Sequence, residues 1–282
     1  MTVPMPYDEP LTLTNCDREP INFIGSIQPY GCLLAVGERD LSISHVSANC
    51  PDYLGLAPAE LFGKSLGEIF STEFCHKLFS QSLKPRLPDS IRSFTTQITT
   101  APAKGREFEC IASQHGGKIM LEFVPQVPSR YLSPGSRTEF RSKLLSVLSQ
   151  GAAIEQICID GAHFVRETVG ADRVMVYRFH DDLHGEVIAE STDRPDRFLG
   201  LHYPARRHFE LNQIRLITDM AVQPVPIESD PAKGLNDPLD LTYSKLRGIS
   251  PVHVEYLRNM GVRATLSISI LVDGSLWGLF AC

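Results

Sequence analysis

A single cysteine, Cys16, lies in the polar N-terminal stretch LTNCDREP. A thiol in such a stretch is poorly placed to pack into a hydrophobic core. Cysteine in its thiolate form is a strong nucleophile, so Cys16 is either incidental or a group that a ligand can reach.

A histidine and a tyrosine fall on one face of an expected helix in SPVHVEYLRNMG. Ser250 and Pro251 suit the cap and first position of a helix, and Gly261 suits its end. Such a face suits a polar ligand in a mostly apolar pocket, although a core histidine held by a backbone carbonyl would look the same. The residues that share this face are His253, Tyr256, Leu257 and Met260.

Hydroxyl groups line one face of a neighbouring expected strand, ATLSISI. Thr265, Ser267 and Ser269 alternate with apolar residues, so their face meets either solvent or an anion. Arg215 and Arg247 stand in the mostly apolar contexts NQIRLI and SKLRGI. A guanidinium in such a context usually pairs with a carboxylate, from the protein or from a ligand.

A third expected strand, RVMVYRF, has Met175, Tyr177 and Phe179 on one face. This face is either ordinary core or an adaptable wall for a ligand. Taken together, these side chains favour a long, flat, apolar ligand with carboxylates at its edge, as in an open-chain tetrapyrrole. Its rings would contact aromatic and methionine side chains, its propionates would bind arginine and hydroxyl groups, and a vinyl group would accept a thiol.

Composition limits the class of protein. The chain has 282 residues, 43% hydrophobic, 21% charged, with a net charge of −6, which is typical of a globular protein and argues against a nucleic-acid surface. No apolar run approaches the ~18 residues of a membrane-spanning helix. The seven cysteines are scattered without a C-x-x-C pair, so neither zinc nor a disulfide framework is indicated. We expect a reduced, cytoplasmic protein without nucleic-acid or membrane partners.

Hydrophobic periodicity indicates an α+β chain in two parts, joined by a linker in QVPSRYLSPGSR. The sequence predicts a half-buried strand in KIMLEFV and a helix in APAELFGKSLGEIF. Asp273-Gly274 is a strong hairpin signal. Expected strands cover 32–36, 41–46, 107–113, 118–124, 173–179, 185–190 and two runs within 265–282, and expected helices include 140–148 and 154–165.

The chain resembles the bacterial phytochromes, in their N-terminal photosensory part, over almost its whole length. The motifs that carry the resemblance are TNCDREPI, GSIQPYG, DRVMVYRF, GEVIAE, LGLHYPA, LRGISPVHVEYLRNMGVRATLSISI and LWGLFAC. The resemblance implies two domains, each an antiparallel sheet flanked by helices. It implies an N-terminal arm with the chromophore cysteine (1–18), a PAS domain (19–126), a linker (127–138) and a C-terminally truncated, bilin-binding GAF domain (139–282). It also implies that the arm is knotted through a GAF loop, with Ile27 in the knot.

The resemblance further implies biliverdin IXα as the cofactor, attached covalently by a thioether to Cys16. Val252 stands where plant and cyanobacterial relatives have the attachment cysteine instead. His253 would lie against the central rings, Arg215 and Arg247 would bind the propionates, and Tyr177 and Tyr203 would line ring D. The other implied chromophore-binding residues are Met175, Ser250, Tyr256, Met260, Thr265, Ser267 and Ser269.

The sequence departs from the family in three places. The family segment Ser-Asp-Ile-Pro is missing between Ala205 and Arg206, and its aspartate normally accepts hydrogen bonds from the pyrrole N–H groups. The chain ends at Cys282, before the PHY domain and the histidine kinase. Smaller substitutions are Asn22 and Tyr30 at positions that commonly carry histidine, and Phe209 where a propionate-contacting tyrosine is usual.

These observations predict a red/far-red photoreceptor module that is not an enzyme. It would signal by photoisomerisation of the bilin to an absent output module, would form a homodimer, and would reach a response regulator only through the missing kinase. One alternative is a bilin-binding scaffold, fluorescent or static, that has lost photoconversion with the missing segment. Another is a cysteine–histidine enzyme that uses Cys16, which no motif supports.

Overall fold

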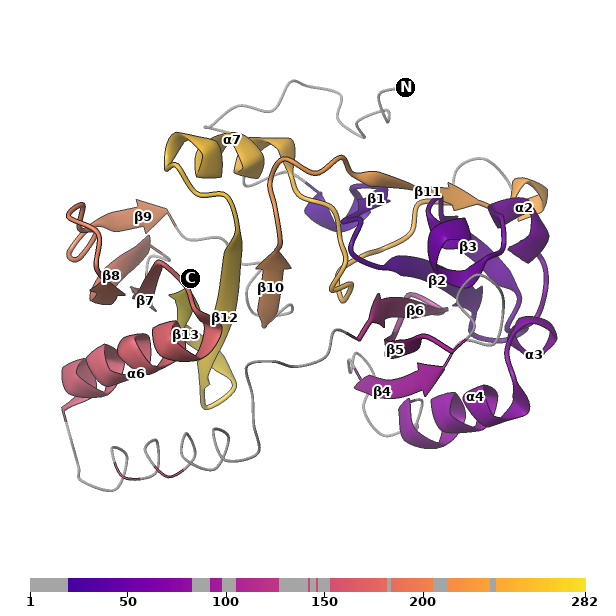
Figure 1. The fold of residues 1–282 in the computed structure, drawn as a ribbon, viewed down its shortest axis with the longest axis horizontal. Coiled ribbons are helices and arrows are strands. Elements are labelled where there is room, and N and C mark those ends of the chain that lie inside the picture. Colours follow the sequence, from indigo (N-terminus) through magenta and orange to yellow (C-terminus); the bar gives the residue numbers. More distant parts are fainter. Residues whose placement is uncertain are drawn as a thin grey trace. The chain divides into compact units, whose positions relative to one another are not determined.

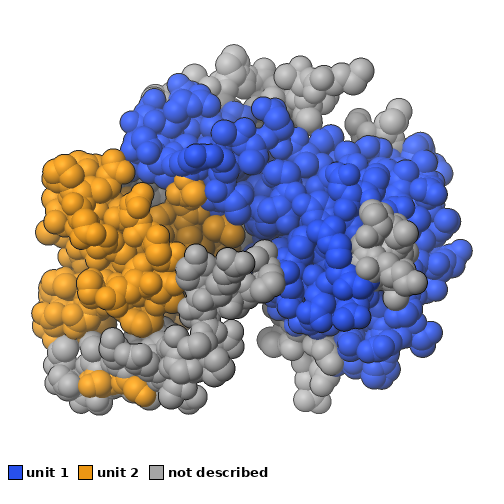
Figure 2. Space-filling model, in the orientation of Figure 1, with its two compact units in different colours: residues 1–126, 217–263 blue, residues 127–216, 264–282 orange. Residues whose placement is uncertain are grey.

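The computed structural model describes residues 20–82, 92–97, 105–126, 142, 146, 153–181, 184–204, 213–233 and 237–282. The chain forms two compact units (Figures 1 and 2), Met1–Gln126 with Ile217–Arg263, and Val127–Leu216 with Ala264–Cys282. Each unit contains an antiparallel sheet with helices, which confirms the predicted α+β class. The expected linker and most of the expected helix 140–148 lie outside the described residues.

The first unit is built on a seven-stranded sheet in the order β1-β11-β3-β2-β6-β5-β4. Its strands are β1 (Ser26–Ile27), β2 (Cys32–Gly37), β3 (Ile43–Ser47), β4 (Arg92–Gln97), β5 (Glu107–His115), β6 (Lys118–Pro125) and β11 (Val225–Ser229). Its helices are α1 (Cys50–Leu54), α2 (Pro58–Leu61), α3 (Leu66–Ile69), α4 (Thr72–Lys77) and α7 (Pro251–Asn259), with short turns η2 (Ile21–Phe23), η3 (Leu78–Ser82) and η5 (Pro231–Lys233). β11 therefore joins a sheet whose other strands come from the first 126 residues, and α7 belongs to the same unit.

The helix predicted over 57–70 is wrong, because the structure forms two short helices there, α2 and α3. Between them Gly63 adopts φ 73°, a left-handed conformation that ends a helix and that glycine adopts without strain. Ser65 then starts α3, since its backbone N–H donates to the Glu68 carboxylate at 2.7 Å. Local capping thus overrides the apolar periodicity of the segment.

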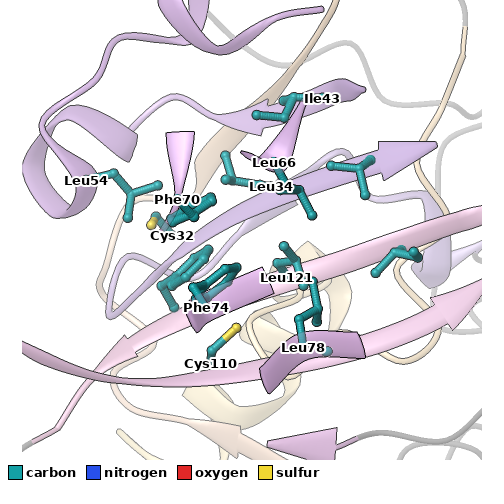
Figure 3. Packing of buried hydrophobic residues seen from close by; sticks show 14 of the residues in the cluster. Cys32, Leu34, Ile43, Leu54, Leu66, Phe70, Phe74, Leu78, Cys110 and Leu121 are labelled. Atoms are coloured by element: carbon teal, nitrogen blue, oxygen red, sulfur yellow. The ribbon is translucent and has the colours of Figure 1, made fainter. Parts of the chain in front are cut away.

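Strand β6 is buried on both faces, so the predicted half-buried strand in KIMLEFV is also wrong. On one face Leu121 and Phe123 of β6 pack with residues of α1–α4. Figure 3 shows Phe70 and Phe74 among the side chains of this core, and their ring centroids are 4.4 Å apart. On the other face a second cluster joins residues of the sheet to residues far along the chain. Its buried members are Ile24, Ile27, Leu33, Ala35, Met120, Leu239, Leu241 and Leu246.

The second unit contains a six-stranded sheet in the order β10-β12-β13-β7-β8-β9. Its strands are β7 (Arg173–Phe179), β8 (His184–Thr192), β9 (His202–Pro204), β10 (Ile214–Ile217), β12 (Thr265–Val272) and β13 (Ser275–Ala281), and its helix is α6 (Ile154–Val169). The predicted hairpin at Asp273-Gly274 is confirmed, because both residues have positive φ, 51° and 79°.

Helix α6 covers one face of this second sheet. Cys158 and Ala162 of the helix pack with Val174 and Val176 of β7. Phe280 of β13 packs against this cluster, and the approach is close: a Cβ atom at Gly161 would lie 3.2 Å from the Phe280 ring. The residues that alternate with Val174, Val176 and Phe280 along their strands therefore lie on the opposite face of the sheet.

Candidate functional site

Helix α7 begins and ends where the sequence predicts. The Ser250 hydroxyl accepts a hydrogen bond from the backbone N–H of His253 at 3.3 Å, and Pro251 is the first helical residue. The helix ends at Asn259, and Gly261 follows with φ 67°. Ser250 thereby fixes the first turn of the helix, on which His253 lies.

His253 and Tyr256 lie together on this helix. Their ring centroids are 6.1 Å apart, with the ring planes inclined by 20°. Val252 and Leu257 of the same helix are buried, whereas His253, Tyr256 and Met260 are half-buried. The apolar side of α7 is thus filled by aliphatic side chains, and the imidazole and phenol remain partly accessible.

Arg247 lies in the turn before α7 and is 6% exposed. Burial lowers the pKa of its guanidinium to about 10, because the charged form loses hydration, and the carboxylates of Asp240 and Glu122 oppose this change. The positive charge is therefore retained at neutral pH although the side chain is largely buried.

Strand β1 runs beside this turn. Ile27, which is fully buried, forms an antiparallel bridge with Arg247, and the Gly248 N–H donates to the Ser26 carbonyl at 2.8 Å. A Cβ atom at Gly248 would lie 2.9 Å from the same carbonyl oxygen, so this approach requires glycine. The predicted passage of the N-terminal arm through a loop stays a prediction, since residues 1–19 lie outside the described ones.

Glu122 on β6 is not among the residues that the sequence predicts for the site. Its carboxylate is fully buried and accepts hydrogen bonds from the Ser244 hydroxyl at 2.7 Å and from the N–H groups of Lys245 and Leu246 at 3.0 and 2.7 Å. Burial raises the pKa of this carboxyl, and the three hydrogen bonds counteract the increase. One signal was available, a lone acidic residue within the otherwise apolar strand run IMLEFV.

In the second unit, the predicted hydroxyl and aromatic residues line up across three strands. The paired rows are Ser269–Leu279–Tyr177 and Ser267–Ala281–Met175. Because paired residues of antiparallel strands point to the same side, both rows lie on the face opposite α6. Ser267, Ser269 and Tyr177 are half-buried, while Met175 and Leu279 are buried. Such a mixture of apolar and hydroxyl groups is typical of a ligand-binding wall.

Other predicted residues lie at the edges of the same sheet. Arg215 is on β10, which neighbours β12, and the Ser269 N–H donates to the Gln213 carbonyl at 2.7 Å. Thr265 begins β12. Tyr203 is on β9, opposite Gly185, although its side chain lies outside the described residues, as do Cys16 and Phe209 entirely.

An ion pair between Arg173 and the buried Glu190 holds the segment around Phe198, which precedes β9. The sequence did not predict this ion pair. Arg173 lies 3.0 Å from the Glu190 carboxylate, whose side chain is 1% exposed, and 2.9 Å from Asp196. The Phe198 ring lies under the guanidinium, with 4.0 Å to the ring centroid, and the Phe198 N–H donates to both oxygens of Glu190 at 3.2 Å. The arginine hydrogen bond lowers the pKa of Asp196 to about 2. These contacts hold the chain that leads into β9 and Tyr203.

Two absences concern the described residues only. Within them, no cluster of three or more His, Cys, Asp or Glu side chains could hold a metal ion. The helices found there are all too short or too polar to cross a membrane.

Two family models match the chain, one described as a PAS fold over residues 16–126 and one as a GAF domain over residues 153–282. Cyanobacterial phytochrome B of Nostoc is 38% identical over 308 residues, and the match covers 100% of this chain and 38% of that protein. The bacteriophytochrome of Xanthomonas campestris is 35% identical over 284 residues, covering 97% of this chain and 43% of that protein. The chain thus spans less than half the length of these relatives.

Solved structures agree over most of the chain. The wild-type chromophore-binding domain of a Stigmatella aurantiaca phytochrome is 37% identical with a TM-score of 0.80, covering 95% of this chain and 90% of that one. The photosensory core module from the same organism gives a TM-score of 0.83 at 37% identity, covering 97% of this chain and 55% of that one. With the PAS and GAF matches and the motif residues on their sheets and helix, these findings show that the chain belongs to the bacterial phytochromes, as a PAS-GAF region of that family of light receptors.

Proposed function

We propose that this chain is a red/far-red photoreceptor module that binds biliverdin IXα covalently through Cys16. The observation that carries the proposal is the sheet face opposite α6, where the register places Met175, Tyr177, Ser267 and Ser269 together. Apolar and aromatic groups there suit conjugated rings, and hydroxyl groups suit propionates. The solved Stigmatella structure at 37% identity is itself a chromophore-binding domain, which supports the same conclusion.

The first unit, taken by itself, carries two groups whose chemistry also suits a bilin. Arg247 offers a buried positive charge to a propionate, and the accessible His253–Tyr256 pair offers ring contacts and polar atoms to the pyrrole groups. When bound, the bilin would supply light absorption and isomerisation of the C15=C16 double bond. The chain's own residues would hold it extended and fix its carboxylates. The change around ring D would bias a two-state element in an output module outside residues 1–282.

The other thiols of the chain are poor candidates for attachment. Cys32, Cys50 and Cys110 are buried in the first core, and Cys158 is buried on the side of α6 that packs against the second sheet. Burial raises the pKa of the half-buried Cys75 thiol and raises the pKa of Cys282 to about 11, which suppresses the reactive thiolate. Cys16 is the remaining cysteine, which supports its proposed role as the nucleophile.

A second candidate function rests on a specific feature, the missing Ser-Asp-Ile-Pro segment between Ala205 and Arg206. Without that acceptor, pyrrole N–H groups would be left without a hydrogen-bond partner, at a cost of about 1–3 kcal/mol. The chain would then bind biliverdin as a fluorescent or static scaffold. A homodimer of this chain is a proposal of the same kind, as is a route to a response regulator through a kinase module that lies outside residues 1–282.

Absorption spectroscopy tests both candidates. The purified chain is mixed with biliverdin, and spectra are recorded before and after saturating red light. A sharp red band that falls under illumination and recovers in darkness is the expected result for a photoreceptor. A sharp band that never changes supports the scaffold, and a spectrum identical to that of free biliverdin refutes both.

Replacement of His253 by alanine is expected to weaken and broaden the red band. Because the imidazole is half-buried and stacked on Tyr256, its removal leaves a gap beside the ligand. Alanine is the best helix former, so α7 itself should persist. The measurement is the height and width of the red band of the biliverdin complex. Glu255→Ala, at an exposed position of the same helix, is the control, and a spectrum of His253→Ala equal to that of the control contradicts the assignment.

A further inference from the structure

The short segment Ser244–Gly248, which precedes helix α7 and contributes Leu246 to the second cluster, is held by hydrogen bonds to strand β6. The Glu122 carboxylate accepts hydrogen bonds from the Ser244 hydroxyl and from the Lys245 and Leu246 N–H groups, at 2.7, 3.0 and 2.7 Å. The Tyr30 hydroxyl donates to the Lys245 carbonyl at 3.1 Å. Both ends of the Lys245 backbone unit are therefore held by side chains from the first 126 residues.

The same segment is bound from the side of β1. The Gln28 N–H donates to the Leu246 carbonyl at 2.7 Å, and the Gln28 side-chain amide donates to the Arg247 carbonyl at 3.3 Å. Gln28 thus holds the carbonyl groups on both sides of the Arg247 Cα atom, which restricts the backbone conformation of this residue. Ser250, which caps α7, follows only three residues later.

Glu122 differs from its surroundings in the sheet. It lies on the same strand face as Met120, and this face packs against Leu33, Ala35 and Leu246 of the second cluster. An ionised carboxylate in such a place is costly unless hydrogen bonds replace its lost hydration. All three of the hydrogen bonds described for it come from the Ser244–Leu246 backbone and hydroxyl. The segment therefore supplies the hydrogen bonds that stabilise the buried carboxylate, and the carboxylate in turn fixes the backbone of the segment.

We propose that Glu122 is a positioning residue for the bilin site, which fixes the backbone of Ser244–Leu246 and thereby orients Arg247 and the first turn of α7. Glu122 needs no contact with the ligand for this role. Its part in bilin binding rests on the proposed function, whereas its part in ordering the segment does not. The site therefore depends on a residue of the PAS-matching region as well as on the residues of the GAF-matching region that carry the ligand contacts.

Glu122→Gln tests the proposal with little change of shape. A glutamine oxygen at the position of Oε1 still accepts from Ser244 and Leu246, but its NH2 group then faces the Lys245 N–H, donor against donor. In the protein without ligand, we expect hydrogen exchange at the Lys245 and Leu246 amides to be about tenfold faster, as for the loss of one buried hydrogen bond. Glu228→Gln, at an exposed position of β11 in the same sheet, is the matched control and should leave exchange unchanged.

A second measurement addresses the bilin. With biliverdin, Glu122→Gln is expected to show about tenfold weaker binding and a weaker red band than Glu228→Gln. Ser244→Ala removes one donor and leaves the carboxylate, so it should give a smaller change in the same direction, and it serves as the test if Glu122→Gln does not fold. Exchange at Lys245 and Leu246 equal to that of the control overturns the proposal.

The outcomes separate this proposal from the proposed function. If Glu122→Gln shows faster hydrogen exchange but binds biliverdin as the control does, Glu122 stabilises the segment only, and its role in positioning the bilin site is overturned. A wild-type chain that binds no biliverdin refutes the proposed function, and the exchange result then decides alone whether Glu122 orders the segment.

Discussion

Cys16→Ser is expected to abolish covalent attachment of biliverdin while leaving non-covalent pigment. A serine hydroxyl is not a useful nucleophile at neutral pH without a general base, whereas a thiol ionises readily enough to add to a vinyl group. The other cysteines cannot replace it easily. At the pKa of about 11 caused by burial, only on the order of one Cys282 thiol in ten thousand is ionised at pH 7.

The measurement is zinc-induced fluorescence of bilin in a denaturing gel, which detects only pigment that is bound covalently. The wild-type band should fluoresce and the Cys16→Ser band should be dark, although its native absorption spectrum should still show bound pigment. Cys75→Ser and Cys282→Ser, at the two half-buried thiols, are matched controls that should fluoresce like the wild type. A fluorescent Cys16→Ser band would show that another thiol is the nucleophile.

Gly278→Ala is expected to destabilise the second unit and to disturb its proposed ligand face. A Cβ atom at Gly278 would collide with the carbonyl oxygen of Tyr177 on the paired strand, and a backbone atom cannot move aside as a side-chain end can. Strands β7 and β13 would have to separate where Leu279 pairs with Tyr177. Overpacking of this kind typically costs about 1–3 kcal/mol and sometimes more.

Thermal unfolding followed by circular dichroism measures the loss of stability, and biliverdin titration measures the effect on binding. We expect Tm to fall by several degrees and the red band to weaken, because Tyr177 moves with its strand. Gly67→Ala in α3 is the control, since a methyl group added there would have no other atom within 4 Å and the backbone is helical. It should leave stability unchanged or raise it by about 0.4–1 kcal/mol. Equal melting of Gly278→Ala and the control would show that the strands adjust without cost.

Local signals in the sequence predicted the parts of the molecule that short-range chemistry determines. Ser250-Pro251 and Gly261 mark the ends of α7, and Asp273-Gly274 marks a hairpin, because capping and positive φ depend on adjacent residues. Strand periodicity likewise placed Ser267 and Ser269 on one face. The pairing register then brought that face together with Tyr177, a step that the sequence pattern alone does not specify.

The features that could not be predicted depend on residues far apart in the chain. KIMLEFV looks half-buried because alternation cannot show that Leu239, Leu241 and Leu246 cover its second face. For the same reason Glu122 was not predicted for the site, since its hydrogen-bond donors lie more than a hundred positions away. The end of the helix at Gly63 was not predicted for a different reason. The apolar pattern of residues 57–70 suits one continuous helix, and it does not show that Gly63 adopts a positive φ that ends α2.

The first unit is built from two separate stretches of the chain, residues 1–126 and 217–263, so the ribosome completes its sequence in two stages. When Gln126 has been added, the second cluster of the first sheet still lacks Leu239, Leu241 and Leu246. At about 5–20 residues per second, the remaining stretch of roughly 120 residues takes on the order of ten seconds to translate. During that time the apolar side chains of this sheet face and the Glu122 carboxylate lack the residues that cover and bind them in the finished unit. The first unit can therefore complete its fold only after Leu246 has been translated.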